Sequence, residues 1–280
     1  MSTKDVMIWR SNRAGTHYVA DTVVVEEPVE IRIRFRDSND KWGERPLSIT
    51  MRTPGDDQAL AVGFMFTEGM LLENQLDKVT IGLENTVTVH FKPDVRPELE
   101  KLQRNFYATS SCGVCGKSSL DSLGYTYENL QWAENLPSLS TELIASLPQK
   151  LTEYQSLFDE TGGIHAAGLF DWEGNLMLSA EDVGRHNAVD KIAGKALINQ
   201  SLPFNQHILV LSGRACFELL HKALALNIPV VVAVGAPSSL AIETAERFGQ
   251  TLIGFARDGR FNVYSGPERL ELQNETRAII

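Results

Sequence analysis

Alternation of apolar and charged residues marks the first half of the chain as rich in strands. Residues 29–36 read Val-Glu-Ile-Arg-Ile-Arg-Phe-Arg, which has the period of two typical of a half-buried strand, and 47–51 and 86–91 continue the pattern. Thr53-Pro54 favours a helix start, with Thr53 as N-cap and Pro54 at the first helical position. The helix over 56–68 is expected to end at Gly69. The pattern predicts a small α+β unit.

The second half alternates predicted strands and helices at short intervals. Strands are expected at 165–170, 176–179, 208–211, 230–234 and 251–255, and helices at 140–158, 187–198, 215–226 and 239–248. A turn at 171–175 joins the first two strands. Because short connections link alternating strands and helices, the pattern predicts an α/β fold with a largely parallel sheet.

A small, polar, glycine-rich segment at 110–119 separates these two halves. A helical stretch over 98–106 leads into it, and a segment of this composition is expected to be a mobile loop near a domain boundary. The predicted domains are therefore a smaller α+β N-terminal domain over 1–125, ending in this loop, and an α/β domain over 126–280.

Composition narrows the class of protein. The chain has 280 residues, of which 43% are hydrophobic, enough for a substantial core. The net charge of -10 disfavours a nucleic-acid binder, because such proteins usually carry a basic face. No apolar run reaches the roughly 20 residues of a membrane span, and the polar start, Met1 to Asp5, precedes no signal-like apolar segment. With three cysteines and no export signal, we expect a cytoplasmic protein without a disulfide framework.

Two of those cysteines, Cys112 and Cys115, form a C-x-x-C pair in the glycine-rich segment. This spacing suits a redox disulfide, half of a zinc site, or a nucleophile with a neighbouring thiol. A structural zinc site needs two further ligands, and Cys216 falls within a predicted helix, where we expect a small core residue. The pattern therefore favours thiol chemistry over metal binding.

A zinc deaminase is disfavoured by the order of the motifs. The signature of that class places H-x-E before P-C-x-x-C. Here the cysteine pair precedes His165, and Ala167 stands where the glutamate is required.

Glycines and arginines follow the predicted strands of the second half. These loops contain Arg185-His186, Ser212-Gly213-Arg214, Gly235 and Arg257-Asp258-Gly259-Arg260. The carboxyl ends of parallel strands form a ligand crevice, where exposed N–H groups, helix dipoles and arginines bind phosphate. Asp182 is expected either to orient His186 or to cap the following helix. Such turns are also common without a ligand, but their convergence predicts a site for a large anionic ligand.

Five segments together carry a family resemblance. They are Cys112 to Gly116, Thr161 to Ala167, Glu181 to Lys191, Ser212 to Ala223, and Gly254 to Tyr264. In this order they closely resemble the FdhD family, sulfurtransferase accessory proteins for molybdenum- or tungsten-dependent formate dehydrogenases. One departure is Cys216, where the family pattern leads us to expect serine.

The resemblance implies a function as well as a fold. Family members take sulfur from a cysteine desulfurase as a cysteine persulfide and pass it to the metal of a bis-molybdopterin guanine dinucleotide cofactor before its insertion into apo-formate dehydrogenase. Their C-terminal domain is cytidine-deaminase-like without the zinc site, and the protein is similar to known homodimers. This implies a cofactor bound as cargo, no permanently bound metal, and no nucleic-acid or membrane partner.

Carried onto this sequence, the resemblance assigns roles to individual residues. Cys112 matches the persulfide-bearing cysteine, and Cys115 is expected to receive, resolve or share the sulfur, with Lys117 favouring ionisation. The cofactor-binding residues are expected to be Phe255, Ala256, Arg257, Asp258, Gly259 and Arg260, together with Arg185, His186, Ser212, Arg214 and Gly235. His165 or His186 is expected to orient the pterin or move protons. The alternative is a non-catalytic cofactor-binding chaperone whose cysteine pair senses redox state.

Overall fold

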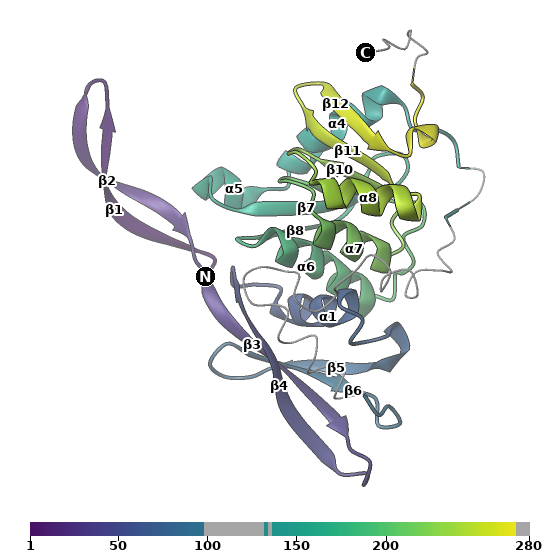
Figure 1. Ribbon diagram of the computed structural model, residues 1–280. Helices are drawn as coiled ribbons and strands as arrows, with labels where there is room; N and C mark the ends of the chain where they lie inside the picture. The colour runs from purple at the N-terminus through teal and green to yellow at the C-terminus, as the bar shows by residue number, and fades with distance from the viewer. Residues whose placement is uncertain (98–131, 134–135, 273–280) are drawn as a thin grey trace.

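The computed structural model describes residues 1–97, 132–133 and 136–272, which form two large sheets, their helices and an N-terminal hairpin (Figure 1). The predicted helix over 98–106 and the glycine-rich segment with the cysteine pair lie outside the described residues. None of the described helices is long and apolar enough to cross a membrane. The described part is a mixed α/β fold.

The larger sheet has six strands in the order β12-β11-β10-β9-β7-β8. They are β7 (His165–Phe170), β8 (Leu176–Asp182), β9 (Ile208–Leu211), β10 (Val230–Ala233), β11 (Thr251–Arg257) and β12 (Arg260–Ser265). Two of its five strand pairs, β9–β10 and β10–β11, are parallel, and the other three, β7–β8, β7–β9 and β11–β12, are antiparallel. The prediction of a largely parallel sheet was wrong, because β7–β8 and β11–β12 are hairpins that no crossover helix separates.

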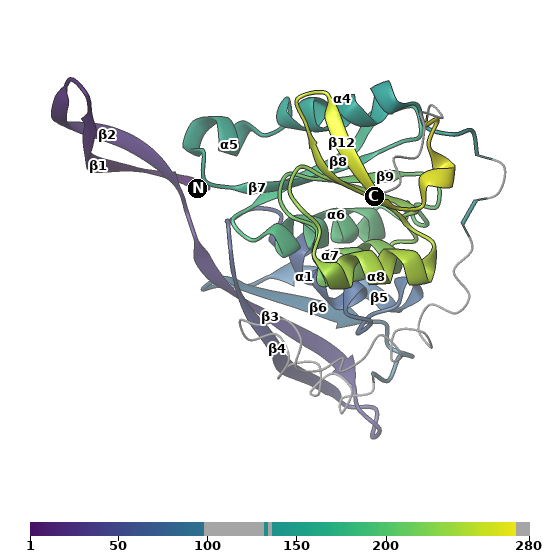
Figure 2. The same cartoon turned by 45° about the horizontal axis from the view of Figure 1, so that its top comes forward.

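Helices cover both faces of this sheet (Figure 2). On one face α4 (Thr141–Thr152) buries Ile144, Leu147 and Leu151 against β7, β9, β10 and β11. On the other face lie α6 (Arg185–Ile198), α7 (Phe217–Ala225) and α8 (Ser239–Phe248), which enclose the main hydrophobic core. The short 3-10 helix η2 (Pro267–Arg269) follows β12.

The N-terminal unit is built from a second sheet and one helix. Its four strands, in the order β4-β3-β6-β5, are β3 (Glu27–Arg36), β4 (Trp42–Arg52), β5 (Leu76–Ile81) and β6 (Thr86–Phe91). The expected alternation holds in β3, where Val29, Ile31, Ile33 and Phe35 are buried. Helix α1 (Asp57–Thr67) packs on this sheet, and the 3-10 helix η1 (Glu73–Gln75) leads into β5. The strand β5, like β12, was not predicted.

The start of α1 differs from the prediction. The N-cap of the helix is Asp56 rather than Thr53. The helix ends before Gly69 as expected, and Gly69 has a positive φ of 71°. Thr53 instead accepts a hydrogen bond from the Val183 N–H through Oγ1 (3.1 Å). It also donates its own N–H to Asp182 Oδ2 (3.2 Å). Thr53, the predicted N-cap, therefore connects the N-terminal unit to the loop before α6 through two hydrogen bonds.

The predicted helix over 140–158 is two helices, α4 and α5 (Ser156–Thr161). The break is stabilised from outside the segment, because the Glu181 carboxylate on β8 accepts the N–H groups of Leu157 (3.0 Å) and Phe158 (2.9 Å). These are orphan donors of the first turn of α5. The pattern along the segment itself contains no sign of this partner.

The N-terminal hairpin, β1 (Thr3–Asn12) and β2 (Gly15–Val24), was not predicted either. It projects from the body as an arm (Figure 1). Both of its faces are largely exposed, so its residues lack the alternation that marks a half-buried strand. Trp9 and Tyr18 pair across it with ring centroids 5.0 Å apart.

Candidate functional site

The loops after β9, β10 and β11 are joined by a chain of backbone hydrogen bonds. The Gly235 N–H donates to the Gly213 carbonyl (2.9 Å), and the Phe255 N–H donates to the Gly235 carbonyl (3.0 Å). Ser212 is fixed to β7, because its Oγ accepts the Ala166 N–H (2.8 Å). The predicted convergence of Ser212, Gly235 and Phe255 at one edge of the sheet is therefore confirmed.

A cavity of about 650 Å³ opens at this edge. Of the predicted ligand residues it is lined by Ser212, Ala256, Arg257, Asp258 and Gly259. The turn between β11 and β12 bends through positive φ values at Asp258 (54°) and Gly259 (72°). This turn brings Arg257 opposite Arg260.

The other predicted ligand residues do not line the cavity. Arg214 and Arg260 are exposed, and Phe255 is exposed by 37%. Phe255 has a φ of 52°, uncommon for a side chain of this size and an observation that favours a functional position. A Cβ at Gly235 would lie 3.0 Å from the Arg214 backbone, so this glycine permits close packing of the two loops.

His165 lines the cavity, and Arg185, which does not, lies close enough to act on the imidazole. Burial, together with the charge of Arg185, lowers the pKa of His165, which lines the cavity. The Nε atom of Arg185 is buried and has no hydrogen-bond partner among the described residues. A buried guanidinium nitrogen without a partner fits an anionic ligand at this position.

His186, next to Arg185 at the start of α6, pairs with Cys216 instead of lining the cavity. Its Nε2 lies 3.2 Å from Cys216 Sγ and 3.8 Å from Glu218 Oε2. Burial and the nearby Arg185 and Lys222 lower the pKa of His186 to about 4, and burial and Glu218 raise the pKa of the Cys216 thiol.

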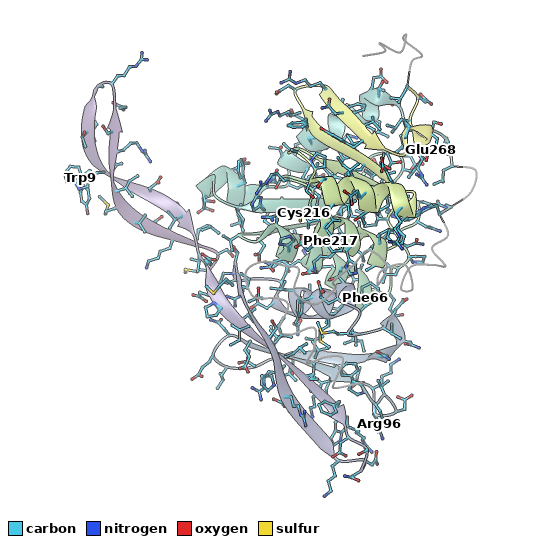
Figure 3. The ribbon with its side chains drawn as sticks, in the orientation of Figure 1. Trp9, Phe66, Arg96, Cys216, Phe217 and Glu268 are labelled. Carbon is cyan, nitrogen blue, oxygen red and sulfur yellow. The ribbon has the colours of Figure 1, made fainter. Side chains whose placement is uncertain are left out.

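Cys216 is not the helical core residue expected from the sequence. It is the half-buried N-cap of α7, immediately before Phe217 (Figure 3). The helix starts two residues later than predicted, and the side chain faces His186.

Asp182 does not orient His186. Its buried carboxylate forms an ion pair with Lys191 (2.8 Å) and accepts the Gly184 N–H (2.9 Å) and the Asn187 side-chain amide (2.9 Å). It therefore fixes the turn that enters α6. It does not cap the helix, because the N-cap is Gly184 and no side chain caps it, so neither expectation for Asp182 holds.

Several residues at the site were not found by sequence reasoning. The wall formed by α4 and α5 contributes Gln155 and Phe158 to the cavity, and it comes from a segment whose pattern indicated only a helix. Glu218 was also missed, although the spacing Cys216-x-Glu218 next to a histidine-bearing helix was a usable signal.

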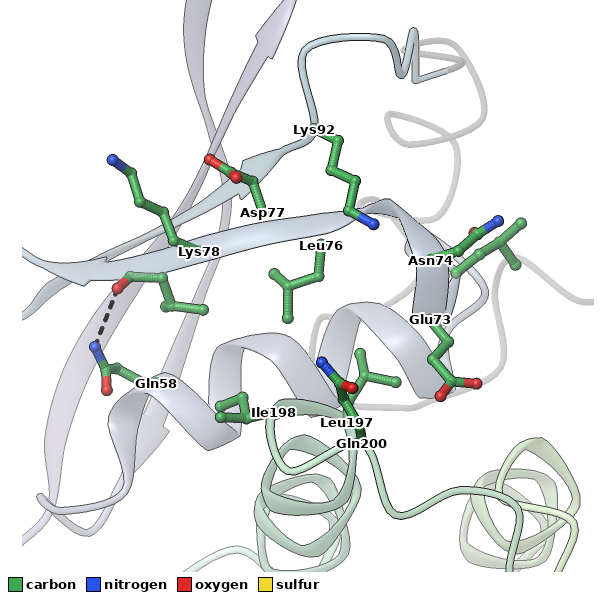
Figure 4. A pocket seen from close by; sticks show the side chains of 12 residues that line it. Gln58, Glu73, Asn74, Leu76, Asp77, Lys78, Lys92, Leu197, Ile198 and Gln200 are labelled. Atoms are coloured by element: carbon green, nitrogen blue, oxygen red, sulfur yellow. Dashed lines mark hydrogen bonds between the residues drawn. The ribbon is translucent and has the colours of Figure 1, made fainter.

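A cavity of about 950 Å³ lies elsewhere, between α1, β5 and the end of α6 (Figure 4). Gln58, from α1, donates to the Val79 carbonyl (3.2 Å) at its wall. Its lining mixes Glu73 and Asp77 with Lys78 and includes none of the predicted ligand residues. Volume alone therefore does not identify the functional site.

Comparison with known proteins places the chain in a family. A sequence profile of the FdhD/NarQ family matches residues 24–271. The chain belongs to this family. Cys112 and Cys115, the predicted sulfur-carrying pair, fall within the matched range but lie outside the described residues.

Family members named sulfur carrier protein FdhD are similar over nearly their whole length. The protein from Streptomyces coelicolor is 48% identical over 266 residues, which cover 90% of each chain. That from Picrophilus torridus is 42% identical and covers 96% of this chain and 98% of its own. A crystal structure from Desulfotalea psychrophila, of a protein proposed as a formate dehydrogenase accessory protein, shares the fold with a TM-score of 0.74 at 24% identity. It covers 96% of this chain and 100% of that one.

Proposed function

We propose that this chain is a sulfur carrier that passes sulfur from a cysteine desulfurase, as a persulfide on Cys112, to the metal of bis-molybdopterin guanine dinucleotide. The recipient of the sulfurated cofactor is apo-formate dehydrogenase. The observation that carries the proposal is the 650 Å³ cavity bordered by the segment 255–260, in a family whose relatives are named sulfur carriers.

The chemistry of the cavity supports an anionic, phosphate-bearing cargo. Arg257 lines it, Arg214 and Arg260 are exposed on the adjoining loops, and the Nε of Arg185 lacks a partner among the described residues. Arginine binds phosphate oxygens in a bidentate manner, and Arg185 opens α6, whose N-terminal N–H groups also favour an anion. These four arginines would hold the two pyrophosphates of the cofactor.

The sulfur step requires a thiolate at Cys112. The thiolate attacks the terminal sulfur of the desulfurase persulfide, forms the new S–S bond, and releases the desulfurase cysteine as thiolate. Cys115 is the neighbouring thiol that receives or resolves this sulfur. This transfer between two cysteines needs no external oxidant or reductant, because the sulfane sulfur keeps its oxidation state. Onward release as sulfide takes two electrons, which Cys115 supplies by displacing the sulfur and forming a disulfide with Cys112.

Three further parts of the proposal follow the family resemblance. The helices on both faces of the six-stranded sheet are compatible with a cytidine-deaminase-like layer. We also propose a homodimer that acts in the cytoplasm. His165, which lines the cavity as a neutral imidazole, is the better placed of the two histidines to orient the pterin.

Cys112→Ala tests the persulfide assignment. After incubation with a cysteine desulfurase and cysteine, mass spectrometry of the wild-type chain is expected to show one added sulfur on the peptide that contains Cys112. The Ala variant is expected to lose this sulfur while its circular dichroism is unchanged, whereas the control Cys216→Ser loads normally. Full loading of Cys112→Ala contradicts the assignment, and a wild-type chain that never becomes sulfurated favours the chaperone alternative.

Arg257→Ala tests the anion site with guanosine diphosphate as the probe. Because a hydrogen bond to a charged group contributes about 1.5–3 kcal/mol, the variant is expected to bind the probe about 10-fold more weakly or worse. The matched control is Arg247→Ala, an exposed arginine on α8, which is expected to leave the affinity unchanged. If calorimetric titrations gave the two variants equal affinities for guanosine diphosphate, Arg257 would not be part of the anion site.

A further inference from the structure

We propose that His186, Cys216 and Glu218 form a binding site for a zinc ion. The three side chains come from the starts of two neighbouring helices: His186 from the first turn of α6, Cys216 from the N-cap of α7, and Glu218 from its first turn. One ligand atom from each residue lies within 4.8 Å of the other two. None of the three residues lines the 650 Å³ cavity.

The separations of the ligand atoms are close to those around a tetrahedral ion. Given Zn–N and Zn–O distances of about 2.0 Å and a Zn–S distance of about 2.3 Å, two ligand atoms of such a site lie about 3.3–3.5 Å apart. The Nε2–Sγ distance is 3.2 Å and the Nε2–Oε2 distance is 3.8 Å. A shift of a few tenths of an ångström brings these two separations to the tetrahedral values, and Cys216 Sγ and the Glu218 carboxylate lie within 4.8 Å of each other.

The donor set and its charges are also suitable. Imidazole, thiolate and carboxylate are the three ligand types that zinc takes in proteins, and metal binding releases the thiol proton to water. Thiolate and carboxylate together neutralise the charge of Zn²⁺. The nearby Lys222 is already balanced by ion pairs with Asp190 (2.9 Å) and Glu68 (3.0 Å). Within the described part of the chain this leaves Arg185 as the cation that acts on His186.

Among the described residues no fourth protein ligand joins these three, which leaves a position for water. The His186 and Glu218 side chains are exposed by 35% and 28%, so an ion between them is reached from solvent. Three protein ligands with one open position are the arrangement of catalytic rather than structural zinc sites. This differs from the expectation that the chain holds no permanent metal, and it does not depend on the sulfur-carrier proposal.

Cobalt(II) titration of the full chain tests the site. The Cys112→Ser/Cys115→Ser double variant is used as the background, because the cysteine pair itself is a potential metal ligand. Under anaerobic conditions we expect one equivalent of Co²⁺ to bind, with a thiolate-to-cobalt charge-transfer band and the visible bands of tetrahedral cobalt. Zn²⁺ is expected to displace the cobalt and to raise the melting temperature, because it binds only the folded state.

Two added substitutions identify the ligands. Cys216→Ser in the same background is expected to abolish the charge-transfer band. Removing a residue that only hydrogen-bonds to a metal ligand lowers metal affinity about 10–100-fold. Glu218→Gln removes a direct ligand, so it is expected to weaken Co²⁺ binding by at least about 100-fold. Glu243→Gln, an exposed position on α8, is the matched control and should change nothing. The proposal is overturned if the background variant shows no charge-transfer band, or if the band persists after Cys216→Ser. In either case His186 and Cys216 form only a thiol–imidazole hydrogen bond.

Discussion

At the scale of single residues, the ammonium group of Lys222 joins three helices. Its Nζ donates to Thr67 Oγ1 (2.9 Å) on α1, to Asp190 Oδ1 (2.9 Å) on α6, and to Glu68 Oε1 (3.0 Å) after α1. Burial alone would lower the pKa of Lys222, but the carboxylates of Asp190 and Glu68 outweigh it and raise that pKa. Lys222 therefore stays charged, and its partners hold the N-terminal unit against the larger sheet.

Lys222→Met is expected to reduce the free energy of unfolding by about 3–5 kcal/mol, because it leaves the carboxylate of Asp190 buried without its cation. Urea denaturation followed by circular dichroism measures the change. Lys78→Met, at an exposed position on β5, is the matched control and should stay within about 0.5 kcal/mol of the wild type. If both variants unfolded at the same urea concentration, the buried ion pair would contribute nothing to stability.

At the scale of elements, α1 and α6 cross at a contact made by two glycines. A Cβ at Gly63 would lie 1.7 Å from the Asp190 carbonyl oxygen, and one at Gly194 would lie 1.8 Å from the Ala59 carbonyl oxygen. Both distances are far below any real contact, so the two backbones approach as closely as they do only because neither residue has a side chain. This crossing sets how the two parts of the chain pack.

Gly63→Ala is therefore expected to destabilise the protein, although alanine is the better helix former by up to about 1 kcal/mol. Overpacking at such a contact typically costs about 1–3 kcal/mol and here must also displace backbone, so the loss should reach the upper end of that range. Thermal unfolding provides the measurement. Gly163→Ala, at a position with room for a methyl group and no positive φ, should leave the melting temperature nearly unchanged. A Gly63→Ala variant as stable as the wild type would contradict the close approach.

At the scale of the whole molecule, histidines in different layers share one electrostatic property. Burial lowers the pKa of His90 on β6, with smaller contributions from Lys78 and Arg34. Burial also lowers the pKa of His207, which precedes β9 in the larger sheet. In both halves the folded state thus disfavours a protonated imidazole.

Acidification is expected to destabilise the fold through these groups. Because the folded pKa lies below the unfolded value of about 6.5, the unfolded state binds more protons as the pH falls below that value. The free energy of unfolding should therefore be level above about pH 7 and fall below it, by at most about 1.4 kcal/mol per pH unit for each histidine. His207→Gln, measured by urea denaturation between pH 7.5 and 5.5 in a chelating buffer, should show a shallower fall. Parallel curves for His207→Gln and the wild type would show that His207 does not contribute.

The sequence by itself determined most of the elements and the sheet edge at which the 650 Å³ cavity opens. Period-two alternation identified β3, and buried apolar runs identified β9 and β10, because burial on one or both faces leaves a direct trace in the residue order. The strand-end loops at Ser212, Gly235 and Arg257 could be assigned to one edge because parallel strands end together. Family membership followed from the same motifs.

Only the tertiary structure decided which side chains meet across those elements. The pairing of His186 with Cys216, the capping of α5 by Glu181 and the role of Thr53 all join positions at least 23 residues apart. The hairpin arm escaped prediction for a related reason, since strands exposed on both faces carry no alternation. Residue order records burial and local backbone preference, whereas contacts between distant residues depend on how the packed elements are oriented in space.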